Sequence, residues 1–339
     1  MEDFDLAVFS LNPLNREMNN GAVIADRIKV VTNSEFTTGI KPKFSYLSSM
    51  KPLRKLYREF QPDIVHAHYA SSYGLLGRLL GARPFFISVW GSDVYEFPKR
   101  SLIHRFVFKR VVNSATHLFS TSHDMARELA KYTKNEITVI PFGIDIHLFC
   151  PEPRKKEEGR KIIGTVKSLE HVYGIDRLIR TTSLLVKEYP GLECHIYGEG
   201  SQKEQLIGLA KDLGIEDAIL FKGYINNKEL PSVLRCFDVF CVLSRQESFG
   251  VAAVEAQACG IPVIATKVGG LPEIVMDGKT GYTVGEDPEE AARKISFLLS
   301  DREQLDKMSK EAREEVLRKY DWSSNVRTLK DHYLSCKTN

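Results

Sequence analysis

The sequence lacks the marks of a membrane-spanning, secreted or zinc-binding chain. No apolar run approaches the roughly 18 residues that cross a bilayer, and the first residues, Met1 to Asp5, have no basic secretory start. The six cysteines are scattered, without a Cys-x-x-Cys pair or a zinc-like histidine spacing. We therefore expect a cytoplasmic protein with reduced cysteines that needs no metal and no bound cofactor.

What is present fits a globular protein of two domains. The chain has 339 residues, of which 43% are hydrophobic and 27% charged, and one hydrophobic core seldom organises so many. Short β-branched runs alternate with helical patterns, which predicts parallel α/β units. The fold class expected is α/β, with two doubly wound Rossmann-like domains facing across a cleft. We place the domains at residues 1–153 and 154–318, divided at Pro151–Pro153, with a final helical segment at 319–339.

Positive charge gathers in the N-terminal half, where residues 1–153 carry 19 Lys and Arg against 15 Asp and Glu. Two segments, Lys41–Arg58 and Lys99–Arg110, hold much of it. The second segment also contains Leu102, Ile103, Phe106, Val107 and Phe108, so it could lie on an anionic membrane as a basic amphipathic helix. A solvated helix packed on its own domain is the alternative.

The most informative segment follows the predicted strand Val239–Leu243. Glu247 falls in a loop, and Ser248 to Ala258 has the pattern of a helix that Gly260 and Pro262 end. A helix start offers unpaired amides and a positive dipole end, which suit a diphosphate. Glu247 on one side could hold sugar hydroxyls, and Glu255 on the other could hold a ribose.

This segment resembles a known family. Glu247 and Glu255, embedded in Glu-Ser-Phe-Gly and Glu-Ala-Gln-Ala-Cys-Gly, are similar to the paired-glutamate motif of retaining GT-B glycosyltransferases of the bacterial mannosyl-, glucosyl- and N-acetylglucosaminyltransferase type. The resemblance runs from about Pro62 to the end of the chain. Further agreements are Pro62–His68, Trp90–Val94, Val139–Asp145, Ile196–Gly200, Phe221–Ile225, Gly269–Glu273, Asp277–Gly281 and Tyr320–Trp322.

The resemblance implies a set of site residues. Catalytic roles fall on Glu247, Lys167 and Asp93, although Asp93 could equally cap the segment after it. Donor-binding roles are expected of Gly198, Gly200, Ile225, Ser248, Phe249, Gly250, Val251 and Glu255. For Lys167, the alternative is a solvated side chain in a loop. For Gly198 and Gly200, which follow a predicted strand, the alternative is a plain turn.

Three departures from the family pattern stand out. The second basic residue of the diphosphate loop, expected just before Gly174, is Tyr173 here. Trp90 occupies the place of a histidine, and indole cannot exchange a proton near neutral pH, so it would stack on a sugar or pack in the core. The chain is also expected to begin at a later strand than its relatives, without their first strand-loop-helix unit.

His66 and His68 are spaced like metal ligands, but we find no third ligand in the sequence and expect a packing or hydrogen-bonding role for them.

The resemblance implies the transfer of a hexose or N-acetylhexosamine from a nucleoside-diphosphate sugar, with retention, to a glycan or lipid-linked hydroxyl in polysaccharide or glycolipid biosynthesis. No nucleic acid partner is expected, and a peripheral place on the inner face of the cell membrane is possible. Two other readings stay open: a sugar-nucleotide 2-epimerase on the same architecture, and a non-catalytic sugar-nucleotide-binding protein.

Overall fold

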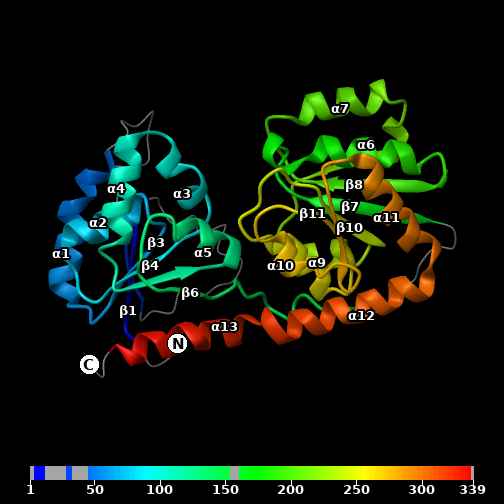
Figure 1. Cartoon of the computed structure of the whole chain (residues 1–339). Coiled ribbons are helices and arrows are strands. Elements are labelled where there is room, and N and C mark those ends of the chain that lie inside the picture. The colour runs from blue at the N-terminus through cyan, green and yellow to red at the C-terminus, as the bar shows by residue number, and fades with distance from the viewer. Residues whose placement is uncertain (1–3, 12–27, 33–44, 153–159, 337–339) are drawn as a thin grey trace. The chain divides into compact units, whose positions relative to one another are not determined.

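The computed structural model describes residues 4–11, 28–32, 45–152 and 160–336. It divides into two compact units, coloured along the chain in Figure 1. The smaller unit comprises residues 1–120, 126–139 and 328–339, and the larger one comprises residues 121–125 and 140–327. Within the described ranges, no helix combines the length and the apolar character that a bilayer crossing requires.

The larger unit is built on a six-stranded sheet in which every pairing is parallel. Its strands, in spatial order, are β12 (Gly281–Val284), β11 (Val263–Thr266), β10 (Val239–Val242), β7 (Lys161–Val166), β8 (Leu192–Tyr197) and β9 (Ile219–Gly223). The chain runs outward from β7 in one direction and from β10 in the other. The sheet therefore has a topological switch point between β7 and β10, where open α/β sheets bind ligands.

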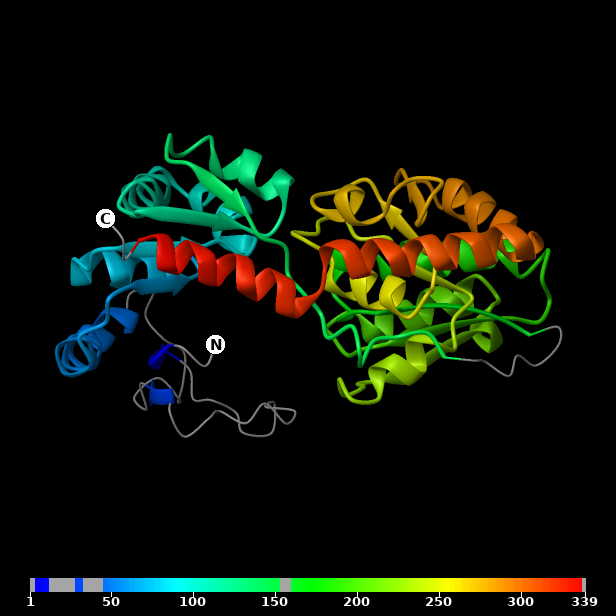
Figure 2. The same ribbon diagram turned by 90° about the horizontal axis from the view of Figure 1, so that it is seen from below.

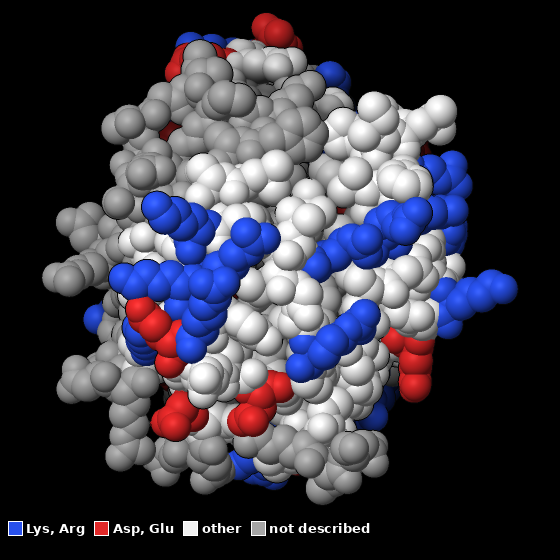
Figure 3. Space-filling model, turned by 90° about the vertical axis from the view of Figure 1, so that its left-hand side faces the viewer, with Lys and Arg blue, Asp and Glu red and all other residues white. Residues whose placement is uncertain are grey.

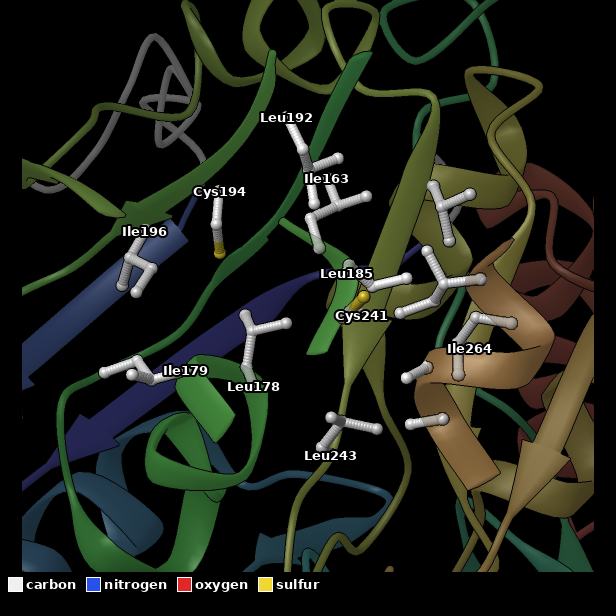
Figure 4. Close-up of a cluster of buried hydrophobic side chains, with 14 of the residues drawn as sticks. Ile163, Leu178, Ile179, Leu185, Leu192, Cys194, Ile196, Cys241, Leu243 and Ile264 are labelled. Carbon is white, nitrogen blue, oxygen red and sulfur yellow. The ribbon is translucent and has the colours of Figure 1, made fainter. Parts of the chain in front are cut away.

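Hydrophobic residues cover both faces of this sheet. Adjacent strand residues alternate between two buried clusters: Ile163 and Cys241 belong to one, and Ile162 and Phe240 to the other. Figure 4 shows part of the first cluster, where side chains of β7, β8 and β10 meet Leu178 and other residues of α6. The near-continuous apolar strands are typical of a parallel sheet covered on both faces.

Helices of the larger unit divide between these faces. The first cluster takes side chains from α6 (Ile175–Leu185), α7 (Lys203–Asp212) and α11 (Pro288–Ser300), and the second from α8 (Leu230–Leu234), α9 (Val251–Ala258) and α10 (Leu271–Ile274). The long α12 (Arg302–Lys319), which Figure 2 shows running along this unit, contacts α9. Two 3₁₀ helices, η4 (His171–Tyr173) and η5 (Glu216–Ala218), complete it.

The smaller unit has a parallel four-stranded sheet in the order β3 (Val65–His68), β4 (Phe85–Ser88), β5 (His117–Ser120) and β6 (Ile137–Val139). A separate parallel pair is formed by β1 (Leu6–Ser10) and β2 (Ile28–Thr32). The helices are α1 (Met50–Phe60), α2 (Ser72–Leu80), α3 (Ser92–Tyr95), α4 (Leu102–Val112) and α5 (His123–Leu129), with 3₁₀ helices η2 (Ser45–Ser49) and η3 (Phe97–Lys99).

The end of the chain completes this smaller unit. Helix α13 (Trp322–Ser335) carries Tyr333, whose hydroxyl lies 2.5 Å from Nδ1 of His66 on β3. Nε2 of His66 lies 2.8 Å from the Ser88 hydroxyl, and His68 stacks on the His66 ring. His66 therefore has the hydrogen-bonding role expected of it. The described residues contain no group of three or more His, Cys, Asp or Glu side chains placed to share a metal ion.

The structure confirms the α/β class. The short apolar runs of the sequence predict the other strands but not β2 and β12, and α9 begins at Val251 rather than at the expected Ser248. The later start of α9 follows from Gly250, whose φ of 113° lies outside the helical range. Most of the segment after Pro151–Pro153, and residues 41–44 of the first basic segment, lie outside the described residues.

We predict that stability of the smaller unit falls in acid because of His66. Burial, together with the charge of His68, holds the pKa of His66 well below its usual value. The unfolded chain therefore takes up the proton first, and this contribution to stability is present above about pH 6.5 and lost as the pH falls below it. The protection factors of the β3 and β4 amides, which are corrected for the intrinsic pH dependence of exchange, should fall between about pH 7 and pH 5, and less so in His66→Gln.

His147→Gln, which replaces an exposed histidine of the larger unit, is the matched control. Equal pH dependence of exchange in wild type and His66→Gln would contradict the assignment.

Candidate functional site

The residues predicted around Glu247 gather at the switch point of the larger unit. Lys167 directly follows β7, and Glu247 lies in the loop between β10 and α9. Since β7 and β10 are adjacent and parallel, both loops leave the same edge of the sheet. Strand order thus brings together two side chains that are 80 residues apart in the sequence.

Lys167 and Glu247 form an ion pair. The Lys167 Nζ atom lies 2.6 Å from Oε2 of Glu247, and the two side chains are only 14% and 11% exposed. The same Nζ lies 4.9 Å from the centroid of the Tyr173 ring, within cation–π range. Tyr173, which stands where the family pattern has a second cation, therefore contacts the first cation instead.

A glycine with positive φ packs closely against the backbone of each member of the pair. Gly198 (φ 134°) follows β8, and a Cβ there would lie 2.0 Å from the carbonyl oxygen of Lys167. Gly269 (φ 52°) precedes α10, and a Cβ there would lie 1.6 Å from the carbonyl oxygen of Glu247. Any larger residue would displace the backbone of the pair. Gly198, predicted to bind donor, thus has a close approach to the chain's own backbone.

The neighbouring donor-binding candidates also have structural partners. A Cβ on Gly200 would lie 2.5 Å from the Leu169 carbonyl oxygen, so this glycine too allows the Lys167 loop to pack closely. Ile225 follows β9 and packs against the second core cluster. The plain-turn alternative accounts for both glycines, and a donor contact at Ile225 stays a prediction.

The start of α9 lies beside the pair. Among the described residues, the amides of Val251 and Ala252 donate to no carbonyl, as expected in the first turn of a helix. Val251 is exposed, whereas Phe249 is buried against Phe142 and Tyr320. The Ser248 carbonyl accepts from the Ser122 hydroxyl at 3.0 Å. Phe249 and Ser248 therefore anchor the loop, and the amides of Gly250 to Ala252 are left without carbonyl partners in the part of the chain that the structure describes, as at the helix starts that bind anions.

Glu255 lies one turn into α9. Its side chain is half-buried, and the burial raises its pKa to about 7, although the charge of Lys167 lowers it in part. The structure therefore brings Glu255 into the electrostatic range of the Lys167–Glu247 pair. A carboxyl group that titrates near neutral pH can accept a hydrogen bond from a ribose hydroxyl or donate one.

Sequence reasoning missed Arg245. Its guanidinium binds Asp176, at the start of α6, with two bonds of 2.8 and 2.7 Å, and donates to the His171 carbonyl at 2.9 Å. The Arg245 amide also donates to the Val172 carbonyl. Arg245 thereby fastens the turn that carries Tyr173 to the loop that carries Glu247. The sequence signal for this contact was Arg245 itself, two residues before Glu247, together with Asp176, the acid that directly follows Gly174 and Ile175.

Asp93 lies in the smaller unit and is fully buried. Its carboxylate accepts from the amides of Ala70 at 2.7 Å, Trp90 at 3.0 Å and Gly91 at 2.9 Å. These three bonds match the capping role, one of the two that the sequence left open, and a contact of Asp93 with an acceptor stays a prediction. Trp90 is 44% exposed and meets His68 edge to face.

Comparisons with known proteins identify the family of the chain. Residues 150–315 match the family model of glycosyl transferases group 1, and residues 1–122 match that of glycosyl transferase 4-like proteins. The chain is 30% identical over 310 residues to N-acetyl-alpha-D-glucosaminyl L-malate synthase of Bacillus anthracis, a match that covers 86% of this chain and 79% of the relative. The chain belongs to the group 1 glycosyltransferases.

Another relative of this glycosyltransferase is the D-inositol 3-phosphate glycosyltransferase of Corynebacterium urealyticum, 33% identical over 223 residues. That match covers 60% of this chain and 52% of the relative, so it spans about half of the relative's length.

Solved structures confirm the GT-B fold. Sucrose-phosphate synthase of Thermosynechococcus elongatus superposes with a TM-score of 0.83 at 20% identity, over 99% of this chain and 90% of the other. HepE of Anabaena, solved in complex with UDP, gives 0.77 at 21% identity, over 91% and 86%.

We predict that Glu255→Gln stabilises the empty protein at neutral and alkaline pH. Because the folded-state pKa is raised, the stability linked to Glu255 is full below about pH 4.5 and is lost as the pH rises to about 7. Glutamine cannot ionise, so above pH 7 its unfolding free energy should exceed that of wild type by on the order of 2 kcal/mol. Denaturant unfolding at several pH values measures this.

Exposed Glu314→Gln on α12 should leave the pH profile unchanged. A Glu255→Gln profile parallel to wild type from pH 5 to 8 would refute the raised pKa.

Proposed function

We propose that this glycosyltransferase moves a hexose or N-acetylhexosamine from a nucleoside-diphosphate sugar to a hydroxyl of a glycan or lipid-linked acceptor, with retention at the anomeric carbon. The observation that carries the proposal is the Lys167–Glu247 pair at the switch point, beside the start of α9 and Glu255. The UDP complex of HepE, which shares the fold, supports a nucleotide donor. Polysaccharide or glycolipid assembly is the proposed setting.

Each group has a part that its geometry allows. Lys167 occupies Oε2 of Glu247, which leaves Oε1 to accept from a sugar hydroxyl. The lysine and the amides of Gly250 to Ala252 would face the diphosphate, and Glu255 would face the ribose. When the C1–O bond breaks, its electron pair goes to the diphosphate oxygen, and these positive groups stabilise that charge.

The same groups make a divalent metal unnecessary in the proposal. One ammonium group and a helix dipole supply positive charge where the leaving diphosphate gathers negative charge. Assays with and without a chelator test this, and a loss of turnover that Mg²⁺ restores would overturn it.

We predict that Lys167→Ala and Glu247→Gln each lower kcat/KM by roughly 10²- to 10³-fold, because each removes a group that acts on the departing diphosphate or the transferred sugar. Lys279→Ala, which removes an exposed lysine paired with Glu311 in the same unit, is the matched control and should keep full turnover. NMR of the product reports the anomeric configuration, and inversion would refute retention.

Reversing the pair with Lys167→Glu and Glu247→Lys separates a structural role from a functional one. If the pair only joined two loops, the double variant would recover activity. We expect it to unfold like wild type and stay inactive, because the sugar and the diphosphate would each face the wrong charge.

We predict that Tyr173 positions Lys167. Tyr173→Phe keeps the ring and should stay within about twofold of wild type, whereas Tyr173→Ala removes the contact and should lower kcat/KM roughly fivefold. Tyr173→Lys should restore the second cation and tighten UDP binding, measured by calorimetry. If Tyr173→Ala bound UDP and turned over like wild type, the ring would have no such role.

A further inference from the structure

Helix α4 carries an apolar surface that the smaller unit does not use. Phe108, Val111 and Val112 face the core and are fully buried. Leu102, Ile103 and Phe106, in the first turns of the same helix, are 84%, 71% and 58% exposed. These three are more exposed than a large apolar side chain usually is when it contributes to its own domain, so they form a protruding apolar tip.

Cations surround this tip. Arg105, Lys109 and Arg110 lie on the same helix, which contains no acid, and none of them has an ion-pair partner among the residues that the structure describes. The Arg110 guanidinium lies 5.1 Å from the Phe106 ring, so charge and apolar surface are in direct contact. Nearby Lys99 and Arg100 are already paired, with Glu128 and Glu96.

The neighbouring helices α1 and α2 also expose cations and an apolar side chain. Helix α2 contacts both α1 and α4, and Arg78 of α2 donates to the Arg110 carbonyl at 2.7 Å. Leu79 of α2 is 46% exposed. Helix α1 adds the exposed Lys51, Arg54 and Arg58. Figure 3, which views the side where these helices lie in Figure 1, shows Lys and Arg side chains spread over the face, with uncharged residues and some Asp and Glu side chains between them.

We propose that this face, defined by Leu102, Ile103, Phe106, Arg105, Lys109 and Arg110 and called the α4 face below, docks on an anionic lipid bilayer. Leucine, isoleucine and phenylalanine would enter the boundary between headgroups and acyl chains, while the cations meet lipid phosphates. Long arginine and lysine stems suit this place, because their apolar part lies on the acyl boundary and their charge reaches the headgroups.

Other occupants fit the face less well. A second copy seated face to face would set Arg105, Lys109 and Arg110 against the same cations. A nucleic acid would meet the cations but leave the protruding leucine and isoleucine without the stacking surface that bases use. An anionic bilayer can contact both the apolar side chains and the cations of the α4 face. The α4 face is not part of the site at β7 and β10, so the docking proposal stands whether or not the proposed reaction does.

Flotation of the full chain with vesicles tests the proposal. We expect binding to vesicles of phosphatidylglycerol mixed with phosphatidylcholine, little binding to phosphatidylcholine alone, and loss of binding when salt is raised to about 1 M. Arg105→Gln with Lys109→Gln and Arg110→Gln should lower the partition coefficient on the order of 10²-fold, at roughly fivefold per cation. Leu102→Ser with Ile103→Ser and Phe106→Ser should also abolish flotation, at unchanged thermal stability.

Two controls match these variants. Lys211→Gln with Lys307→Gln and Lys310→Gln removes three exposed cations from helices of the larger unit, and Leu317→Ser removes an exposed leucine of α12. Both should float like wild type. Glu247→Gln should float like wild type as well, which separates docking from transfer.

Failure of the wild-type chain to float at low salt would overturn the proposal. So would equal binding to neutral vesicles, or loss of binding in the larger-unit controls. Concentration-dependent dimerisation that the apolar triple variant abolishes, with no flotation, would identify a second copy as the occupant instead.

Discussion

The order of strands in the larger unit determines what the rest of the site can do. Because β7 and β10 are adjacent and parallel but far apart in the sequence, the loops after them meet, and Lys167 comes within 2.6 Å of Glu247. A largely buried pair of this kind adds little to folding stability, since losing water costs each charge much of what their attraction returns. Its physical value is local: the lysine and the carboxylate hold each other in fixed positions before any ligand arrives.

Much of the surrounding structure maintains those positions. Gly198 and Gly269 allow neighbouring loops to pack closely against the backbone of Lys167 and Glu247. The Arg245–Asp176 ion pair connects the turn that carries Tyr173 to the loop that carries Glu247. Because of Gly250, α9 begins later, and its first amides lie next to the pair. Preorganised dipoles and charges of this kind need no rearrangement when charge develops. The replacement of a second cation by Tyr173 then changes the site from two point charges to one charge held against a ring.

The sequence predicted the α/β class and most of the strands, because the core strands are short apolar runs and the chain punctuates them with glycine and proline. It did not predict β12, whose residues Gly281–Val284 include a tyrosine and a threonine and look like a loop. Glu247 and the start of α9 are close in the sequence and could be grouped from the residues, whereas Lys167 joined them only through the resemblance, since the sheet order brings it there. The close approach of Gly269 to the Glu247 backbone was missed because backbone contacts leave no residue pattern, and Arg245 was missed because its partner Asp176 is 69 residues away in the sequence. For Asp93, the three backbone donors could not be foreseen from its spacing, and its role towards an acceptor stays a prediction.

Helix α13 has a consequence for how the protein is made. The buried face of β3, β4 and β5 is covered by side chains such as Tyr333 and His332, which the ribosome adds more than 200 residues after those strands. Synthesis proceeds from the N-terminus, so the small sheet must wait through the whole of the larger unit with His66, Phe86 and Phe119 uncovered. The larger unit, whose own core closes by Arg327, can finish first. The half of the molecule that is translated first is therefore the half that matures last, and during that interval its aromatic face is open to chaperones.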